Sequence, residues 1–223
     1  EFKDEYANMP VDVQKDEEKG LYYVQKEKKR LYFRKSTPAK KIQKYYRALS
    51  MEQDRRSPHH YFNSVKEVTG KVFVDVGCAE GYSSLEIIEE AKHVYLFEQD
   101  EQWLEAIRAT FEPWQDKVTI VQKYVSDHNS SREQTLDDFF NNQTDEHLFL
   151  KMDIEGAERH ALAGCKNLFQ NCQKLDFAIC TYHLRDDEEV ISAFLNKHNC
   201  TYINQKGFFR HRIRSVVMRG SKK

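Results

Sequence analysis

The sequence predicts an α/β protein with a mostly parallel, seven-stranded sheet and helices on both of its faces. From residue 71 onward, short apolar runs alternate with amphipathic segments. Runs rich in β-branched and aromatic residues, without polar alternation, are typical of strands buried on both faces. Helices between successive strands make those strands parallel. No helix separates the last two runs, which predicts an antiparallel strand at the C-terminal end of the sheet.

The expected elements divide the chain into an N-terminal α/β extension, 1–69, and a domain, 70–223. The strands of the domain are expected at 71–77, 93–100, 117–126, 147–156, 174–183, 200–205 and 214–220. Amphipathic periodicity predicts the helices between them at 82–91, 101–111, 135–140, 157–169 and 186–198.

The N-terminal extension has a more irregular pattern. Residues 1–19 are polar and acidic, and we expect them to be frayed. Aromatic and charged side chains alternate through residues 20–33, which predicts a two-stranded ribbon. A helix follows, and Ser57 with Pro58 has the composition of an N-cap and a first helical position. We therefore expect a second helix to begin at Ser57.

The composition argues against several classes of protein. The 35 Lys and Arg nearly balance the 36 Asp and Glu, so no stable nucleic-acid partner is expected. No apolar run approaches the ~20 residues of a transmembrane helix, and no signal peptide is visible. The five cysteines lack CxxC or zinc-type spacing, which is typical of buried thiols in a reducing compartment. We expect a cytoplasmic protein, and the sequence does not predict its oligomeric state.

The turn after the first predicted strand is the first candidate ligand site. Gly77 and Gly81 let the backbone approach a ligand closely, and ligands of open parallel sheets bind beyond the carboxyl ends of the strands. The turn is not a dinucleotide fingerprint, because Ala79 replaces the middle glycine, and it lacks the lysine of a phosphate loop. Glu80 also places a negative charge where a pyrophosphate would lie. A ligand without phosphates is therefore expected.

Acidic residues around this turn favour a cationic nucleoside. Asp75 lies near the end of the first strand, and Glu98 ends the second, where an acid typically accepts hydrogen bonds from ribose hydroxyls. S-adenosylmethionine is a sulfonium nucleoside with these properties. The structural alternatives are a turn that merely needs glycine and a solvated strand end. The predicted cofactor-binding residues are Asp75, Gly77, Cys78, Ala79, Gly81, Tyr82, Ser83, Glu98, Gln99, Ser126 and Asp153.

The block KMDIEGAE, 151–158, is the most specific motif of the chain. Together with VDVGCAEGYSSL and VYLFEQD, it resembles the FkbM-type methyltransferases over roughly residues 70–200. The segments EQD…SPHHY and CTYH are similar to a bacterial subgroup associated with cell-surface polysaccharide synthesis. The resemblance implies a class I, Rossmann-like methyltransferase fold, S-adenosylmethionine as cofactor, and O-methylation of a hydroxyl, often on a sugar.

The ends of the fourth and fifth strands supply the candidate catalytic residues. His183 ends the fifth strand and is our predicted base, since histidine is the commonest general base near neutral pH. Asp153 ends the fourth strand, and Lys151 lies on the same face two residues earlier. The structural alternative for His183 is a polar cap at the end of the strand, and the alternative for Lys151 is an ion pair with Glu155 or Asp153. We mainly expect a site without a metal ion, although Asp153 and His183, with Asp186, could hold magnesium.

Candidate acceptor-binding residues lie outside the cofactor turn. His59 and His60 precede the first strand and can fold over the acceptor, Glu155 flanks a helix start, and Arg210 belongs to the basic stretch FFRHRIR. Solvated surface is the alternative for each of them. The expected acceptor is a sugar or polysaccharide. A natural-product methyltransferase, an RNA 2′-O-methyltransferase and a non-catalytic scaffold with the same fold remain open.

Overall fold

A seven-stranded sheet with the order β11-β12-β10-β9-β4-β5-β6 forms the centre of the protein. The computed structural model describes residues 2–141, 146–209 and 212–222. The strands are β4 (Val72–Val76), β5 (His93–Phe97), β6 (Val118–Val121), β9 (His147–Met152), β10 (Lys174–Cys180), β11 (Thr201–Phe209) and β12 (Arg212–Lys222). Strand β12 pairs antiparallel with β10 and β11, and the pairs among β10, β9, β4, β5 and β6 are parallel. The predicted fold class is confirmed.

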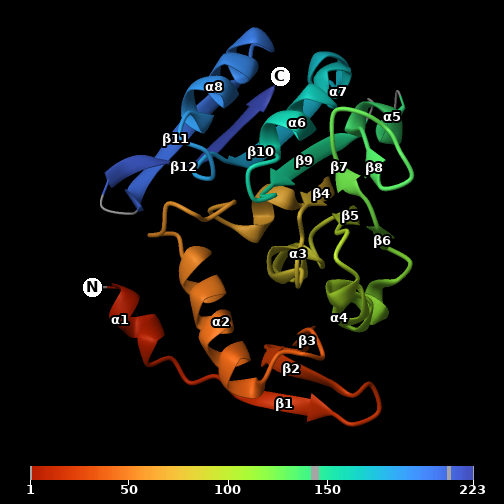
Figure 1. Ribbon diagram of the computed structural model, residues 1–223, viewed down its shortest axis with the longest axis vertical. Helices are drawn as coiled ribbons and strands as arrows, with labels where there is room; N and C mark the ends of the chain where they lie inside the picture. The colour runs from red at the N-terminus through yellow and green to blue at the C-terminus, as the bar shows by residue number, and fades with distance from the viewer. Residues whose placement is uncertain (1, 142–145, 210–211, 223) are drawn as a thin grey trace.

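Helices cover both faces of this sheet (Figure 1). They are α3 (Tyr82–Ile87), α4 (Glu101–Phe111), α5 (Leu136–Phe140), α6 (Glu158–Ala163), α7 (Lys166–Asn171) and α8 (Asp187–Lys197). Neighbouring residues of β4 point to opposite faces, so Phe73 packs in the cluster of α3 and α4, whereas Val74 packs in the cluster of α5 to α8. The carboxyl ends of the parallel strands stay uncovered by these helices.

Several predicted elements are shorter in the structure, and the strands expected at 93–100, 147–156 and 174–183 end at Phe97, Met152 and Cys180. The helix expected at 157–169 is interrupted after Ala163, because the chain at Gly164 passes against Ser126, leaving only 2.0 Å between a Cβ built there and the Ser126 carbonyl oxygen. The strand expected at 117–126 ends at Val121, and β7 (Tyr124–Val125) pairs instead with β8 (Glu133–Gln134). The helix predicted at 82–91 ends at Ile87.

The N-terminal extension contains more structure than its sequence indicates. It comprises α1 (Phe2–Ala7), the antiparallel sheet β1 (Val13–Asp16), β2 (Leu21–Lys26) and β3 (Lys29–Tyr32), and α2 (Ala39–Glu52). Strands β2 and β3 are the predicted ribbon, but the prediction that residues 1–19 are frayed is wrong, because β1 pairs with β2.

The helix predicted to begin at Ser57 is also wrong. The Ser57 hydroxyl accepts a hydrogen bond from the His59 amide at 3.2 Å, which closes a short turn instead. The next helical element is the 3₁₀ helix η1 (Val65–Val68), capped by Ser64. Ser57 and Pro58 therefore begin a turn that leads toward the sheet.

One hydrophobic cluster joins the extension to the domain. Leu31, Phe33 and Ile42 of the extension belong to the same buried cluster as Phe73 and Leu85 of the domain. The boundary at residues 69 and 70 stays a prediction, since the two parts share this core. None of the helices in the described part of the chain combines the length and the apolar character that crossing a bilayer requires.

Candidate active site

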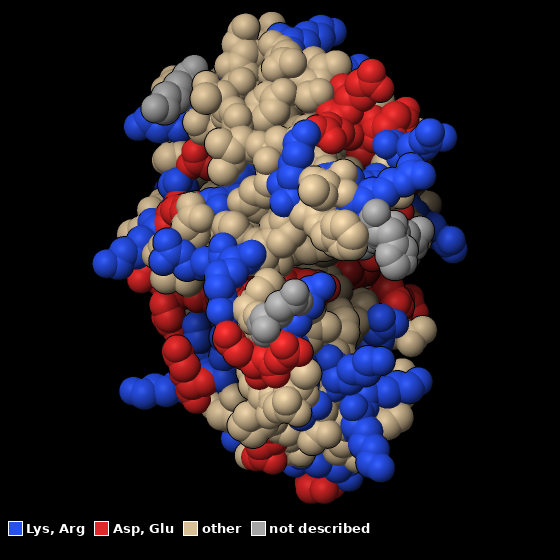
Figure 2. Space-filling model, turned by 90° about the vertical axis from the view of Figure 1, so that its left-hand side faces the viewer, with Lys and Arg blue, Asp and Glu red and all other residues tan. Residues whose placement is uncertain are grey.

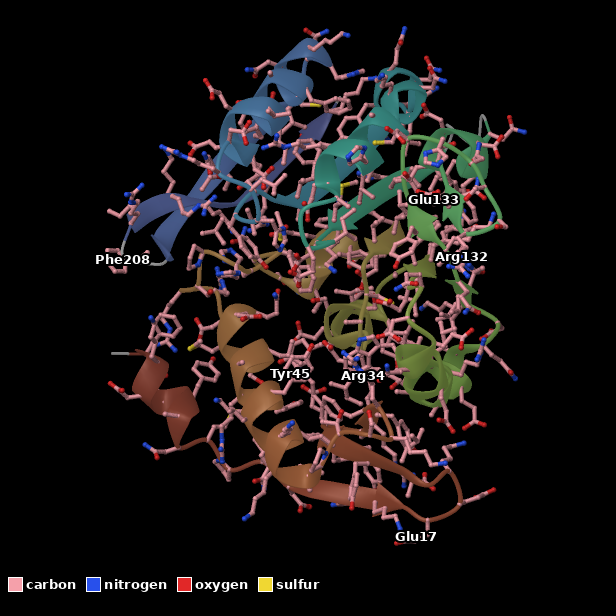
Figure 3. All side chains as sticks on the ribbon, viewed as in Figure 1. Glu17, Arg34, Tyr45, Arg132, Glu133 and Phe208 are labelled. Atoms are coloured by element: carbon pink, nitrogen blue, oxygen red, sulfur yellow. The ribbon has the colours of Figure 1, made fainter. Side chains whose placement is uncertain are left out.

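A cavity of about 580 Å³ lies at the carboxyl ends of β4, β5 and β9, where the domain meets the N-terminal extension. Figure 3 shows Arg34 and Tyr45 of the extension in the space between α2 and α4. The predicted cofactor residues that line the cavity are Asp75, Gly77, Cys78, Ala79, Tyr82, Ser83, Glu98, Gln99 and Asp153. The extension adds Arg34, Tyr45, Leu49, Glu52, Gln53 and Tyr61.

The glycine turn is shaped by close packing. Gly77 has a φ of +79°, and a Cβ at this position would lie only 2.2 Å from the carbonyl oxygen of Asp153. Gly81 has a φ of +81° and caps α3, and its Cβ would lie 2.6 Å from Cε2 of Phe111. Gly77 therefore brings the end of β4 against the end of β9, so that the cofactor turn and Asp153 border one cavity.

Glu98 fixes the same turn from the neighbouring strand. One carboxylate oxygen accepts a hydrogen bond from the Ala79 amide at 3.1 Å, and the other accepts one from the Asp100 amide at 2.8 Å. Asp100 in turn pairs with the Arg34 guanidinium at 3.2 Å, and that guanidinium stacks over the Trp103 ring at 3.9 Å. The predicted ribose acid thus lies at the cavity.

Lys151 and Asp75 form a buried ion pair. The Lys151 ammonium lies 2.8 Å from one Asp75 oxygen and donates to the Gly77 carbonyl at 2.7 Å. The Ser84 hydroxyl donates to the second Asp75 oxygen at 2.6 Å. Burial alone would lower the pKa of Lys151, but the charges of Asp75 and Asp153 outweigh it, and the pKa is raised. Lys151 therefore stays charged, and this arrangement favours the ion-pair alternative over a catalytic role.

Asp153 lies between two tyrosines at the inner end of the cavity. Tyr61 of the extension donates to one Asp153 oxygen at 2.6 Å, and Tyr182 donates to the other at 3.5 Å. Burial, and then the charge of Asp153, raises the pKa of Tyr61 well above its ordinary value. Tyr61 therefore remains protonated and holds the carboxylate in place.

His183 lies behind Asp153 rather than among the residues that line the cavity. Its Nδ1 is 2.9 Å from Glu158, and its Nε2 is 3.5 Å from both Asp153 and Glu155. The side chain is only 8% exposed. Burial opposes its charged form, but Glu158, Asp153 and Glu155 outweigh burial and raise the pKa of His183 above its ordinary value. His183 is therefore charged more readily than a free histidine, and it contacts the site through Asp153.

Asp153, Glu158 and His183 are also the candidate metal ligands. One ligand atom from each lies within 4.8 Å of the others. Glu158 accepts a hydrogen bond from the Ile154 amide at 2.8 Å through one oxygen and lies 2.9 Å from His183, so an ion pair between Glu158 and His183 is the alternative to a bound cation. Asp186, the third ligand expected from the sequence, pairs with Arg159 instead.

The family model for the methyltransferase FkbM domain matches residues 76–203, which is more than half of the chain. The chain belongs to the FkbM methyltransferase family. This membership confirms the resemblance that the KMDIEGAE block indicates. A comparison with curated proteins finds no match.

Two solved structures agree with this FkbM assignment in their fold. A methyltransferase FkbM from Methylobacillus flagellatus KT aligns with a TM-score of 0.55 and 17% identity, over 82% of this chain and 55% of that one. The chain thus spans about half the length of that protein. Magnesium protoporphyrin IX methyltransferase from Synechocystis PCC 6803, solved with bound S-adenosylmethionine, aligns with a TM-score of 0.52 and 12% identity, over 84% and 86% of the two chains.

The predicted acceptor residues of this FkbM methyltransferase lie in different places. The His59 ring packs edge-on against Tyr182 at 5.1 Å, next to the cavity. His60 is buried, and its ring nitrogens contact the Ser57 carbonyl and Asn63, so its role is structural. Glu155 lines the cavity with a side chain that is 92% exposed. Arg210 lies outside the described residues.

Two predicted cofactor residues do not line the cavity. Gly81 caps α3 behind the turn. Ser126 is buried with its carbonyl against Gly164, while Lys123, Tyr124 and Val125 line the cavity just before it. The adenine contact predicted for Ser126 stays a prediction, and the neighbouring segment is the better placed part of the chain.

Sequence reasoning missed the contribution of α2. Tyr45, Leu49 and Glu52 have the spacing i, i+4, i+7 and line the cavity together. Tyr45 donates to Glu80 at 2.7 Å, and Glu80 is only 3% exposed. Burial raises the pKa of Glu80. The sequence contains one signal of this contribution, because Glu52 is an acid that continues the helix face formed by Tyr45 and Leu49.

Proposed function

We propose that this protein transfers the methyl group of S-adenosylmethionine to a hydroxyl group of a sugar or polysaccharide. The observation that supports this most is the charge of the cavity. Of the three cations among the described residues that line it, Lys151 and Arg34 are paired with Asp75 and Asp100, and Lys123 donates to the Ser130 carbonyl and the Gln134 side chain, while the carboxylates that line the same space outnumber these cations. Such a cavity favours a sulfonium cofactor and a neutral acceptor, and disfavours phosphorylated or acidic acceptors.

The cofactor half of the proposed site is the glycine turn with Glu98. In this proposal, Glu98 accepts hydrogen bonds from the ribose hydroxyls, and the residues of the turn approach the cofactor through their main chain. Asp153 would then lie on the side of the cavity where the methyl group is transferred, because Gly77 packs directly against that residue. The field of the surrounding carboxylates stabilises the sulfonium before transfer.

The acceptor half is formed by Asp153, Tyr61 and Tyr182, with His59 and Glu155 at its edge. Carboxylate and phenol groups beside aromatic rings suit a polyol, which offers hydroxyls as donors and acceptors together with an apolar ring face. Residues 1–69 act as the acceptor-site lid in this proposal. A cytoplasmic location stays a prediction.

His183 is the base predicted from the sequence, and this role also remains a proposal. Because His183 does not line the cavity, a proton would have to reach it through Asp153. A His183→Ala variant that keeps full turnover would refute the role. A divalent cation at Asp153, Glu158 and His183 stays a secondary proposal, tested by comparing turnover in EDTA with turnover in added magnesium.

Binding and transfer are tested in turn. Calorimetric titration with S-adenosylmethionine and S-adenosylhomocysteine is expected to show binding of both, and Glu98→Ala is expected to weaken both by roughly tenfold or more. Exposed Glu105 on α4 gives the control variant Glu105→Gln, which should bind like the parent. Absence of binding in the parent protein would favour a scaffold without catalysis.

Acceptor screening follows, with methyl-labelled cofactor and matched sets of neutral sugars, acidic sugars, phenolic natural products and RNA. Label in neutral glycans is the expected result. Label in RNA, with binding that weakens steeply in salt, would support the RNA alternative instead. Figure 2 shows acidic and basic side chains interspersed over most of one face of the molecule, which does not favour that alternative.

A further inference from the structure

Glu52 has an unusual position at the C-terminal end of α2. It is the last residue of that helix and faces the cavity with Tyr45 and Leu49. No hydrogen bond or ion pair ties its carboxylate to another residue in the described part of the chain. A negative charge at a helix C-terminus is also unfavourable, because the helix dipole places partial negative charge there. Nothing in the fold therefore requires an acid at this position.

The surroundings of Glu52 are acidic on several sides. Burial, and then the charges of Asp153, Glu80 and Glu155, raises the pKa of Glu52 to about 7. Two of the three cations that line the cavity in the described part of the chain are held by other acids, Lys151 by Asp75 and Arg34 by Asp100, and the third, Lys123, donates to the Ser130 carbonyl and to Gln134. His59 packs beside Tyr182. The titratable and charged groups that line the cavity together with Glu52 are Arg34, Tyr45, Tyr61, Asp75, Cys78, Glu80, Tyr82, Glu98, Asp100, Lys123, Tyr124, Lys151, Asp153, Glu155 and Tyr182.

These observations extend the proposed function, on which the inference rests. We propose that Glu52, which lines the cavity, is the base that accepts the proton of the acceptor hydroxyl in place of His183, which does not line it, and that the bound sulfonium brings Glu52 into the ionised form. The positive charge of the cofactor enters a space in which the lining carboxylates outnumber the lining cations and in which the Glu52 carboxylate is not tied to a cation of the described residues. Glu52 therefore loses its proton when the cofactor binds and is ready to accept one when an acceptor follows.

The reaction balances with these groups alone. The acceptor oxygen forms a bond to the methyl carbon while the bond between that carbon and sulfur breaks, and its electron pair stays on sulfur. The product S-adenosylhomocysteine is neutral. The hydroxyl proton moves to the Glu52 carboxylate, which becomes a carboxylic acid. Each turnover thus removes the positive charge of the sulfonium and the negative charge of Glu52 together.

The test compares the cationic cofactor with its neutral product and needs no acceptor. Affinities for S-adenosylmethionine and S-adenosylhomocysteine are measured by calorimetry between pH 6 and pH 8, in EDTA so that no metal contributes charge. Since a group with a pKa of about 7 is largely protonated at pH 6, the sulfonium should lose roughly tenfold in relative affinity from pH 8 to pH 6. The ionisation of the ligands themselves is the same for every variant.

Glu52→Gln removes the titrating group with little change in shape. We expect it to abolish this roughly tenfold change in the ratio of the two affinities while it binds S-adenosylhomocysteine within about threefold of the parent. The control Glu105→Gln should keep the full change. If the change persists in Glu52→Gln, or is absent from the parent protein, Glu52 does not respond to the sulfonium and the inference is overturned. If neither ligand binds the parent protein, the proposed function itself fails.

Once an acceptor is known, turnover gives a second readout. Glu52→Gln should lower kcat by about 10²–10⁴-fold, and Glu52→Asp should recover part of it. A Glu52→Gln variant with the kcat of the parent would refute the role of base, even if the cofactor charge is sensed.

Discussion

Replacing Gly77 with alanine tests whether the cofactor turn and the end of β9 are built as one unit. The backbone at Gly77 has a φ of +79°, and an added Cβ would lie 2.2 Å from the Asp153 carbonyl oxygen and 2.6 Å from Cγ2 of Ile154. Contacts under 3.0 Å essentially never occur for a Cβ, so this oxygen must move by at least 0.8 Å. Because the oxygen is main chain, β9 must shift with it.

Gly70 offers a matched control for the magnitude. It has a φ of +71°, but a Cβ there would meet nothing within 4 Å. Gly70→Ala should therefore cost only the conformational penalty of the left-handed region, about 1 kcal/mol after the gain from a stiffer unfolded chain. Gly77→Ala adds an overpacking cost of about 1–3 kcal/mol, which gives about 2–4 kcal/mol in total.

Urea unfolding of the two variants and the parent measures these free energies. Gly77→Ala should also weaken S-adenosylhomocysteine binding, whereas Gly70→Ala should leave the affinity unchanged. If Gly77→Ala is no more destabilising than Gly70→Ala, the contact between the turn and Asp153 does not constrain the protein in solution, and the reasoning is refuted.

Three further predictions concern stability. Lys151→Met leaves the buried Asp75 carboxylate unpaired, so urea unfolding should show a loss of about 3–5 kcal/mol, and a loss below about 1 kcal/mol would contradict the buried ion pair. The raised pKa of His183 means that its charged form contributes stability below its ordinary pKa of about 6.5 and that this contribution is lost as pH rises through the higher folded value. The free energy of unfolding, measured in EDTA, should therefore be lower at pH 8.5 than at pH 6, and Glu158→Gln should make this difference smaller. An equal difference in the parent protein and in Glu158→Gln would contradict the interaction between His183 and Glu158. Thr135→Ala removes the N-cap of α5 and should cost about 0.5–2 kcal/mol in the same assay, a cost that Thr135→Ser should largely avoid.

The sheet was predictable because each of its parallel strands has a pattern of its own. Val72–Val76 is buried at every position, as a continuous apolar run indicates. The strand Val13–Asp16 was not predictable, since its residues are half-buried or exposed and its pairing with β2 is what makes it a strand. Tertiary context likewise decided the break after Ala163, which depends on a neighbour 38 positions earlier, Ser126.

The residues of the candidate site were also predictable only in part. Asp75, the glycine turn, Glu98 and Asp153 were predictable because parallel strands end at a common edge. Glu52 and Tyr61 were not, because nothing in the pattern of residues 1–69 tells where α2 and the segment after it lie relative to the sheet. The position of His183 behind Asp153, rather than in the cavity, also depends on Glu158, whose burial only the fold establishes.

Helix α2 also constrains how such a protein can change during evolution. Ile42 and Tyr46 lie in the hydrophobic core, while Tyr45 and Glu52 of the same helix border the cavity. A shift of the helix that admitted a new acceptor would therefore disturb the core that anchors the extension. New acceptor preferences should arise when the side chains that face the cavity are replaced while the helix keeps its position. Sequence differences among relatives should therefore concentrate at the positions that face the cavity and be rare at the core positions between them.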